Sequence, residues 1–319
     1  MKYIALTIAV MLGMAAFAQE EENTGPWKTS GIASFTVNQA SFSNWSAGGE
    51  NSIATMALFK FFGDYTKDNF SINNSATFKY GLLKNESEPL KKSEDLIELN
   101  SQFNQKFSDN WSASGLINFT SQFANGYNYP DTSTVVSKFL SPAYLTVAPG
   151  ILYKPVDYFS ILMSPASLRT IFVMDQDLAD LGAFGVDPAE IDTVTGNKIS
   201  DGENVKVKLG AFVEFYFKKE IKTDLSFESK LNFFYNYLPD DVIPEGAAPL
   251  DVHWQNFINY KLNNWFSANL FVHLAYIPGD VRIESVPPVG GIGENKIEVK
   301  ANDKMQLKQT FGIGFAYNF

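Results

Sequence analysis

The sequence predicts an all-β protein: a transmembrane antiparallel up-and-down β-barrel of about 12 strands, with long outer loops and short periplasmic turns. Three observations predict it: an export signal, long segments that alternate apolar and polar residues, and connections that alternate between long and short. Composition argues against several other classes of protein. A chain of 319 residues with net charge −10 and no cysteine is unsuited to general nucleic-acid binding, disulfide scaffolds or thiolate metal sites. No internal stretch reaches the roughly 18 to 20 uninterrupted apolar residues that a membrane helix needs.

The N-terminal residues predict a secretory signal peptide. Lys2 gives a positive start, Ile4 to Phe17 is an apolar run too short to span a membrane, and Ala16-Phe17-Ala18 has the small-x-small pattern of a cleavage site. A buried N-terminal helix is the alternative. We therefore expect three parts: residues 1–18 as signal peptide, 19–28 as a flexible segment and 29–319 as the barrel.

The alternation is clearest at the C-terminus. From Met305 to Phe319 the odd positions are apolar apart from Gln309, and the even positions are polar or small. Successive side chains of a strand point to opposite faces, so this pattern gives one apolar and one polar face. The segments are longer than the usual strand of about 5 or 6 residues and fit a tilted bilayer-crossing strand of about 9 to 11. Twelve segments show it: 29–41, 52–65, 70–83, 95–107, 111–124, 143–155, 159–173, 205–219, 222–238, 251–262, 265–276 and 304–319.

The connections alternate in length. Five connections are short: those near residues 66–69, 108–110, 156–158, 219–222 and 263–264. Several of them are rich in Asp and Asn, which suit tight turns. The connections between these short turns are long. Short turns at one rim and long loops at the other are typical of outer-membrane barrels, and an even strand number places both termini on the short-turn side. An aromatic residue directly follows each of four short turns, where its ring would lie at the level of the lipid headgroups. These residues are Phe70, Trp111, Phe159 and Trp265.

Two alternatives are a secreted β-sandwich and a soluble protein divided into two domains within residues 174–204. Strand length and loop alternation favour the barrel, and closure leaves no unpaired strand edge in hydrocarbon.

The final strand ends in Phe319, which resembles the signal that outer-membrane assembly machinery reads; a strand that simply ends in Phe is the alternative. We expect the cell outer membrane, with its lipid and lipopolysaccharide as surroundings, and no nucleic-acid partner.

The polar faces predict the lining of the lumen. Charges of both signs recur there, so the residues either pair with one another and fill the lumen or line a water-filled pore. Inward apolar residues would narrow any channel: Leu58, Phe62, Leu116, Phe212, Phe234 and Phe271. The candidate pore-lining residues are Lys79, Glu98, Lys106, Lys206, Lys208, Glu214, Glu228, Lys230, His253 and His273.

Catalysis has little support. His253 and His273 would lie opposite each other across a three-residue turn near Asn263, and with Asp251 they could bind a metal or act as a base. Two lumen histidines bonded to water or carboxylates are the favoured alternative, because a metal site needs a third ligand. The acidic 175–204 loop matches no calcium-binding spacing. We expect no catalytic residues, no metal and no cofactor.

The segment Asn44-Trp45-Ser46-Ala47-Gly48-Gly49-Glu50-Asn51-Ser52 resembles an uncharacterised Bacteroidota outer-membrane β-barrel family, domain of unknown function 3078. Further agreement lies at Trp27-Lys28, Ser121-Gln122-Phe123, Ser141-Pro142-Ala143-Tyr144, Ser164-Pro165, Gly182 to Val186 and Gly312 to Phe315. The resemblance implies an outer-membrane barrel of a Gram-negative bacterium and no activity.

Asn44, Trp45, Gly48 and Gly49 form a candidate constriction loop, since a Trp in an outer connection needs burial and the glycines permit a tight path. The alternative is an outer girdle Trp beside an ordinary turn.

Two functions remain open. One is a passive channel for small polar solutes. The other is a non-conducting scaffold or interaction barrel, a subunit of a secretion, assembly or surface complex. Its protein partner would bind the outer loops 174–204 and 277–303, the second of which contains a possible extra strand at Lys296 to Lys300.

Overall fold

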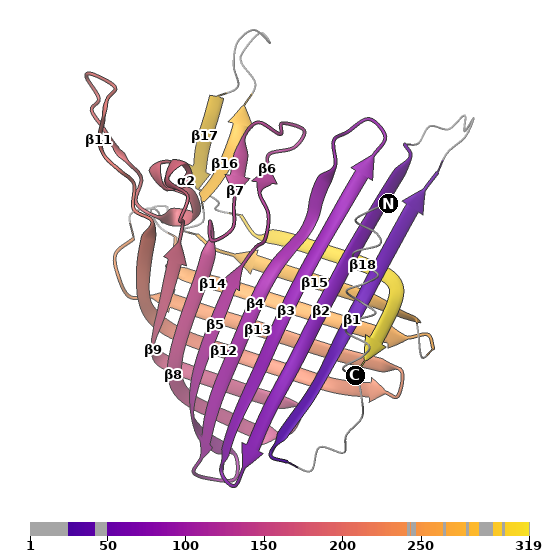
Figure 1. The fold of residues 1–319 in the computed structure, drawn as a ribbon. Helices are drawn as coiled ribbons and strands as arrows, with labels where there is room; N and C mark the ends of the chain where they lie inside the picture. The colour runs from indigo at the N-terminus through magenta and orange to yellow at the C-terminus, as the bar shows by residue number, and fades with distance from the viewer. Residues whose placement is uncertain are drawn as a thin grey trace.

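The computed structural model describes residues 25–41, 50–240, 243, 247–263, 266–278, 281–286, 296–301 and 304–318. Within them, twelve antiparallel strands close into one barrel, in which each strand pairs with its neighbours along the chain and β1 closes on β18 (Figure 1). The predicted fold class is confirmed. The barrel strands are β1 (Trp27–Ala40), β2 (Ser52–Lys67), β3 (Phe70–Asn85), β4 (Lys91–Lys106), β5 (Trp111–Ser121), β8 (Ala143–Val156), β9 (Phe159–Phe172), β12 (Val205–Lys222), β13 (Leu225–Asn236), β14 (Leu250–Lys261), β15 (Phe266–Tyr276) and β18 (Gln306–Asn318).

Three boundaries differ from the prediction. The β3–β4 connection, expected to be long, comprises only residues 86–90, because a bulge near Ser93 interrupts the alternation of β4 and hid its first residues. The turn predicted at 219–222 is wrong: β12 continues through an irregularity to Lys222, and Thr223 and Asp224 make the turn. Trp27 already pairs with Tyr65, so the barrel begins inside the segment expected to be flexible.

The barrel has the polarity of a membrane protein. Its lumen is lined mainly by polar and charged side chains, whereas large apolar side chains are exposed on the outside of many strands. Such a surface is costly in water but stable in lipid, where a closed barrel also satisfies every backbone group. The chain is a multi-pass β-barrel of the outer membrane. Exposed outward residues include Leu99, Phe103, Ile117, Ile151, Leu168, Val207, Trp254, Ile258, Leu307, Phe311 and Phe315.

Aromatic side chains gather at the short-turn rim. The ring centroids of Trp27 and Tyr65 are 5.2 Å apart, Phe70 lies 6.3 Å from Tyr65, and Trp111 packs 4.5 Å from Tyr153. These contacts place rings where the headgroups lie, as predicted for Phe70 and Trp111.

The predicted position at the lipid headgroups is wrong for Phe159. This residue lines the lumen, and the ring centre of the preceding Tyr158 lies 5.7 Å from that of Phe217 instead. The turn comprises only Asp157 and Tyr158, one residue fewer than the pattern suggested, because β8 continues through Val156. Trp265 lies outside the described residues.

The barrel closes between β1 and β18 over a short register, from Ile32 opposite Asn318 to Thr36 opposite Gly314. A Cβ at Gly314 would lie 2.7 Å from Thr36 Oγ1 and 2.8 Å from the Phe35 carbonyl oxygen. Only glycine permits this approach, so the seam depends on it. Phe319 and the predicted signal peptide lie outside the described residues.

The long loops carry small elements above one rim (Figure 1). These are β6 (Gly126–Tyr127) with β7 (Val135–Ser137), α2 (Gln176–Asp180), η1 (Ala183–Gly185), β10 (Glu190–Ile191) with β11 (Lys198–Ser200), and β16 (Val281–Val286) with β17 (Lys296–Ala301). β17 confirms the possible extra strand. No helix among the described residues is long and apolar enough to cross a membrane.

Candidate functional site

The lumen contains a cavity of about 850 Å³, which we call the inner cavity. Side chains from nearly every barrel strand line it, and the lining extends to Asp157 and Asn263 in the β8–β9 and β14–β15 turns. The cavity therefore reaches the short-turn rim. Its volume lies within the range of about 300 to 1,000 Å³ that is usual for small-molecule sites.

One wall of the inner cavity is neutral and polar. On β3, β4 and β5, Asn118 donates a hydrogen bond to the Asn100 side chain at 2.6 Å, and Asn100 donates to Ser75 at 3.3 Å. Deeper, Ser114 donates to Asn104 at 2.7 Å. These amides and hydroxyls hold one another in place, and their remaining donors and acceptors face the cavity.

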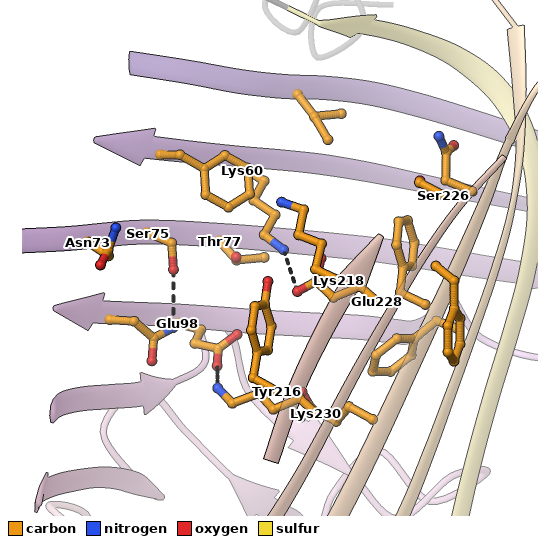
Figure 2. Close-up of a pocket in the computed structure, with 18 of the residues that line it drawn as sticks. Lys60, Asn73, Ser75, Thr77, Glu98, Tyr216, Lys218, Ser226, Glu228 and Lys230 are labelled. Atoms are coloured by element: carbon orange, nitrogen blue, oxygen red, sulfur yellow. Dashed lines mark hydrogen bonds and ion pairs between the residues drawn. The ribbon is translucent and has the colours of Figure 1, made fainter. Parts of the chain in front are cut away.

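The facing wall, on β12 and β13, is charged, and two of its residues pair across the lumen with Lys60 of β2 and Glu98 of β4 (Figure 2). Lys60 Nζ lies 3.6 Å from a carboxylate oxygen of Glu228, and Lys230 Nζ lies 3.5 Å from Glu214 and 3.9 Å from Glu98. The pairs join strands across the lumen, since Glu98 lies on β4 and Lys230 on β13. Such pairing is what allows charges to remain in a barrel interior.

The charges of the inner cavity nearly balance. Two of the lysines lie over the same aromatic ring: the Nζ atom of Lys60 is 5.0 Å from the ring centre of Phe62, and that of Lys218 is 4.7 Å from it. A ring face favours such cations. The charged lining residues are Lys60, Lys79, Lys154, Lys218, Lys230 and Lys261, with Asp64, Glu98, Asp157, Glu214 and Glu228.

The rest of the lumen on the β5–β13 side is filled. A buried apolar cluster of Leu116, Ala148, Leu152, Leu162, Phe212 and Phe234 comes from β5, β8, β9, β12 and β13. Above it, Arg169 Nη1 binds Asp251 Oδ2 at 2.6 Å, and the guanidinium lies 4.2 Å from the ring centre of Phe234. At the level of this cluster the open space lies on the opposite side of the barrel, whereas nearer the short turns the cavity also touches β8, β9, β12 and β13. The inward apolar residues narrow the lumen as predicted: Leu58, Phe62, Leu116 and Phe271 line the cavity, and Phe212 and Phe234 are buried.

The two histidines contact each other, with His253 Nδ1 3.2 Å from His273 Nε2. The expected direct pairing is wrong, because His253 lies opposite Ala275 and His273 opposite Gln255. The centre of the β14–β15 pairing lies one residue later than the sequence suggested, which moves the register by two and leaves the rings diagonal. No group of three or more His, Cys, Asp or Glu side chains among the described residues could hold a metal ion.

Half of the predicted lining residues lie in the inner cavity: Lys79, Glu98, Glu214, Glu228 and Lys230. Lys106 lies at the end of β4 and is exposed at the short-turn rim, outside the cavity lining. Lys206 and Lys208 lie at the outer end of β12 and bind Asp240 of the next outer loop, at 2.9 and 2.7 Å. The candidate constriction loop, with Asn44, Trp45, Gly48 and Gly49, lies outside the described residues.

Asp240 fastens an outer loop to the barrel mouth. Burial opposes the ionisation of its carboxyl group, but hydrogen bonds from Lys208 and Lys206 outweigh burial and lower its pKa. Lys206 also reaches Asp187 in the preceding outer loop, at 3.2 Å. One lysine therefore ties two outer loops together.

The acidic loop between β9 and β12 uses its charges to fold. Asp175 caps α2 by accepting from the Leu178 backbone N–H, and it also pairs with Lys138. Asp180 accepts hydrogen bonds from Lys198, Gln176 and the Gly202 backbone N–H, which lower its pKa to about 2. The loop also has an apolar core of its own, formed by Ile171, Val173, Leu178, Ala179, Ala183 and Val186.

Sequence reasoning missed two lumen residues, Arg169 and Glu94, for the same reason. A register shift in β9 around Pro165 reverses the alternation, so that Arg169 faces inward, and the bulge in β4 had placed Glu94 in a predicted loop. A proline inside a strand pattern is a recognised sign of a bulge, so Pro165 was the available signal. Gly81, opposite Glu94, was the corresponding signal in β3.

Comparison with protein families gives a match to one segment of the chain. Residues 37–127 match the family described as a protein of unknown function, DUF3078. The resemblance noted in the sequence is thereby confirmed over that DUF3078 segment, which runs from the end of β1 to β6. No curated protein matches the chain.

Solved barrels are similar only at low identity. The COG4313 outer membrane channel from Pseudomonas putida F1 shares 8% identity with this chain at TM-score 0.40, over 92% of this chain and 96% of that one. The NanC porin shares 7% at 0.38, over 90% and 98%. The translocator domain of the autotransporter NalP from Neisseria meningitidis shares 9% at 0.32, over 99% and 96%. At these values the comparisons say nothing of solute or mechanism.

Proposed function

We propose that this outer-membrane barrel is a passive channel for small polar solutes. The observation that carries the proposal is the inner cavity of about 850 Å³, lined by amides, hydroxyls and nearly balanced charges and reaching the short-turn rim. Water remains stable against such a lining, and a small polar solute exchanges its hydration for the same groups. Beyond the inner cavity the apolar cluster fills the β5–β13 side, so at that level any path runs along the other side of the lumen.

Single-channel recording from the refolded protein in a planar bilayer tests this function, after heat-shifted gel mobility has shown that the barrel is folded. We expect discrete conductance steps. Asn100→Trp, which places bulk in the lumen, should lower the unit conductance several-fold. Its matched control is Leu99→Trp, the adjacent residue of β4 whose side chain is exposed on the outside, and it should conduct like the unchanged protein. A folded barrel that never conducts would refute the proposal.

A second candidate is an interaction barrel, favoured by the β10–β11 hairpin. Three apolar side chains are exposed on this hairpin beyond the membrane-spanning strands: Ile191, Val194 (92% exposed) and Ile199. Apolar side chains held in water on an outer loop suit a protein partner. Crosslinking in cells tests it: a partner captured by the unchanged chain and lost in the Val194→Ser/Ile199→Ser variant would support it, and the same capture by both would refute it.

A further inference from the structure

Two solvent-filled spaces are stacked in the lumen. Beyond the inner cavity lies a second pocket of about 370 Å³, which we call the outer pocket, lined by β1, β2, β4 and β18. Along two strands, consecutive inward-facing residues line first the inner cavity and then the outer pocket, so these strands form a continuous wall beside both spaces. On β1 these residues are Ile32 and Ser34, then Thr36 and Asn38; on β2 they are Lys60 and Leu58, then Met56 and Ala54.

A cluster of four side chains separates the two spaces. Glu94 is buried, and its Oε2 atom lies 2.8 Å from Lys308 Nζ and 4.0 Å from Lys79 Nζ. Thr310 donates a hydrogen bond to its other oxygen at 3.1 Å. Lys79 lines the inner cavity, whereas Glu94, Lys308 and Thr310 line the outer pocket. We call these four residues the Glu94 cluster.

The backbone is shaped to bring Glu94 into this position. The bulge in β4 leaves Ser93 without a partner and places Glu94 opposite Gly81. A Cβ at Gly81 would lie 2.7 Å from Ser93 Oγ and 3.0 Å from Glu94 Cβ, so the approach requires glycine. Lys79 is held from the other side, with its ammonium 4.5 Å from the ring centre of Phe271.

The cluster has two cations for one carboxylate. The side chain of Lys308 is half-exposed and lines the outer pocket, whereas that of Lys79 is largely buried. A small anion entering from the outer pocket can take the place of the Glu94 carboxylate on Lys308, and then on Lys79, so that each ammonium keeps a partner throughout. A cation meets two ammonium groups at the same point and is repelled.

We propose that the Glu94 cluster is the constriction and selectivity site of the channel, through which small organic carboxylates pass by exchanging with Glu94 on Lys308 and Lys79. This inference rests on the proposed channel function. The pathway beyond the cluster continues past lysines of the inner cavity: Lys60 on the neighbouring strand β2, and Lys218 and Lys230 on the far wall.

Reversal potentials in asymmetric potassium chloride and potassium acetate test the site. We expect the unchanged channel to prefer chloride and acetate over potassium. Lys308→Gln, at a half-exposed position that tolerates change, should lower the anion-to-cation permeability ratio several-fold, and Lys79→Gln/Lys308→Gln should abolish or reverse it. Glu94→Gln should raise both conductance and anion preference. Lys106→Gln is the matched control, because Lys106 is exposed at the short-turn rim outside both linings.

The outcomes separate the two proposals. A folded barrel that never conducts would overturn the channel function, and the selectivity site with it. A conducting barrel whose reversal potential is unchanged in Lys308→Gln and in the double lysine variant would overturn the selectivity site alone. A shift of equal size in Lys106→Gln would overturn it too, since the effect would then be one of overall charge.

Discussion

The pair formed by Arg169 and Asp251 offers the sharpest test of how the lumen is stabilised. Its two side chains are only 12% and 9% exposed, and the guanidinium also stacks on Phe234. Charge centres in such contact are about 4 Å apart, which corresponds to about 4 kcal/mol at an effective dielectric constant of about 20. That attraction offsets the cost of removing both charges from water, so the pair as a whole contributes little, although each member depends on the other.

Asp251→Asn should therefore lower the free energy of unfolding by about 3 to 5 kcal/mol, because it leaves a buried guanidinium without its counter-charge. The double variant Arg169→Met/Asp251→Leu removes both charges and fills the same space with apolar atoms. We expect it to return to within about 1 kcal/mol of the unchanged protein. Asp157→Asn is the control: its exposed pair with Lys154, at 3.6 Å, should be worth less than about 1 kcal/mol.

Equilibrium urea unfolding in lipid vesicles, followed by tryptophan fluorescence and heat-shifted gel mobility, measures these differences. The reasoning fails if Asp251→Asn is as stable as the Asp157→Asn control. It also fails if the double variant is less stable than Asp251→Asn, because the pair would then be a net source of stability rather than two mutually dependent charges.

Three further predictions concern glycine packing, the outer loop and the aromatic rim. Gly210→Ala should reduce the yield of refolded barrel severely, because a Cβ there would lie 2.1 Å from the Tyr235 carbonyl oxygen; Gly115→Ala, with nothing within 4 Å, should refold normally on the same gel. The pKa of Asp180 is lowered to about 2, so its contact with Lys198 should persist from neutral pH to about pH 4 and be lost between about pH 4 and pH 2. Acid-stable protease digestion of the loop at stepped pH measures this: Asp180→Asn should be cleaved faster than the unchanged protein above about pH 4, and the difference should disappear as the pH falls to about 2. Trp111→Ala should slow folding into vesicles and lower stability by about 3 to 5 kcal/mol, measured by urea titration, since it removes a packed ring at the headgroup level.

Much of the barrel could be predicted because lipid imposes a simple rule on each strand. Every second residue must be apolar where it faces hydrocarbon, so the sequence records strand number and the orientation of regular strands. Glu98 on β4 and Lys230 on β13 were assigned to the lumen in this way, and both line the inner cavity.

The rule fails where the backbone departs from strict alternation. A bulge shifts one strand by a residue and turns the following side chains to the other face, which is why Glu94 and Arg169 were missed although they contribute the buried carboxylate and the buried guanidinium of the lumen. Turn position has the same effect on register: a turn between β14 and β15 centred one residue later than expected moves His253 away from direct pairing with His273. Local hydrophobicity carries no record of either event.

The lumen is asymmetric around its circumference, and this asymmetry determines where a solute can travel. On the β5–β13 side, buried apolar residues such as Phe234 and Leu162 and the Arg169–Asp251 pair leave no space for water. On the opposite side, the inward faces of β1 and β2 pass from the inner cavity to the outer pocket, which β18 also lines. This face includes the barrel seam, where Gly314 approaches β1 closely. The strands that close the barrel are therefore also those that line the path, so changes there should alter conductance, whereas changes on the filled side should alter stability.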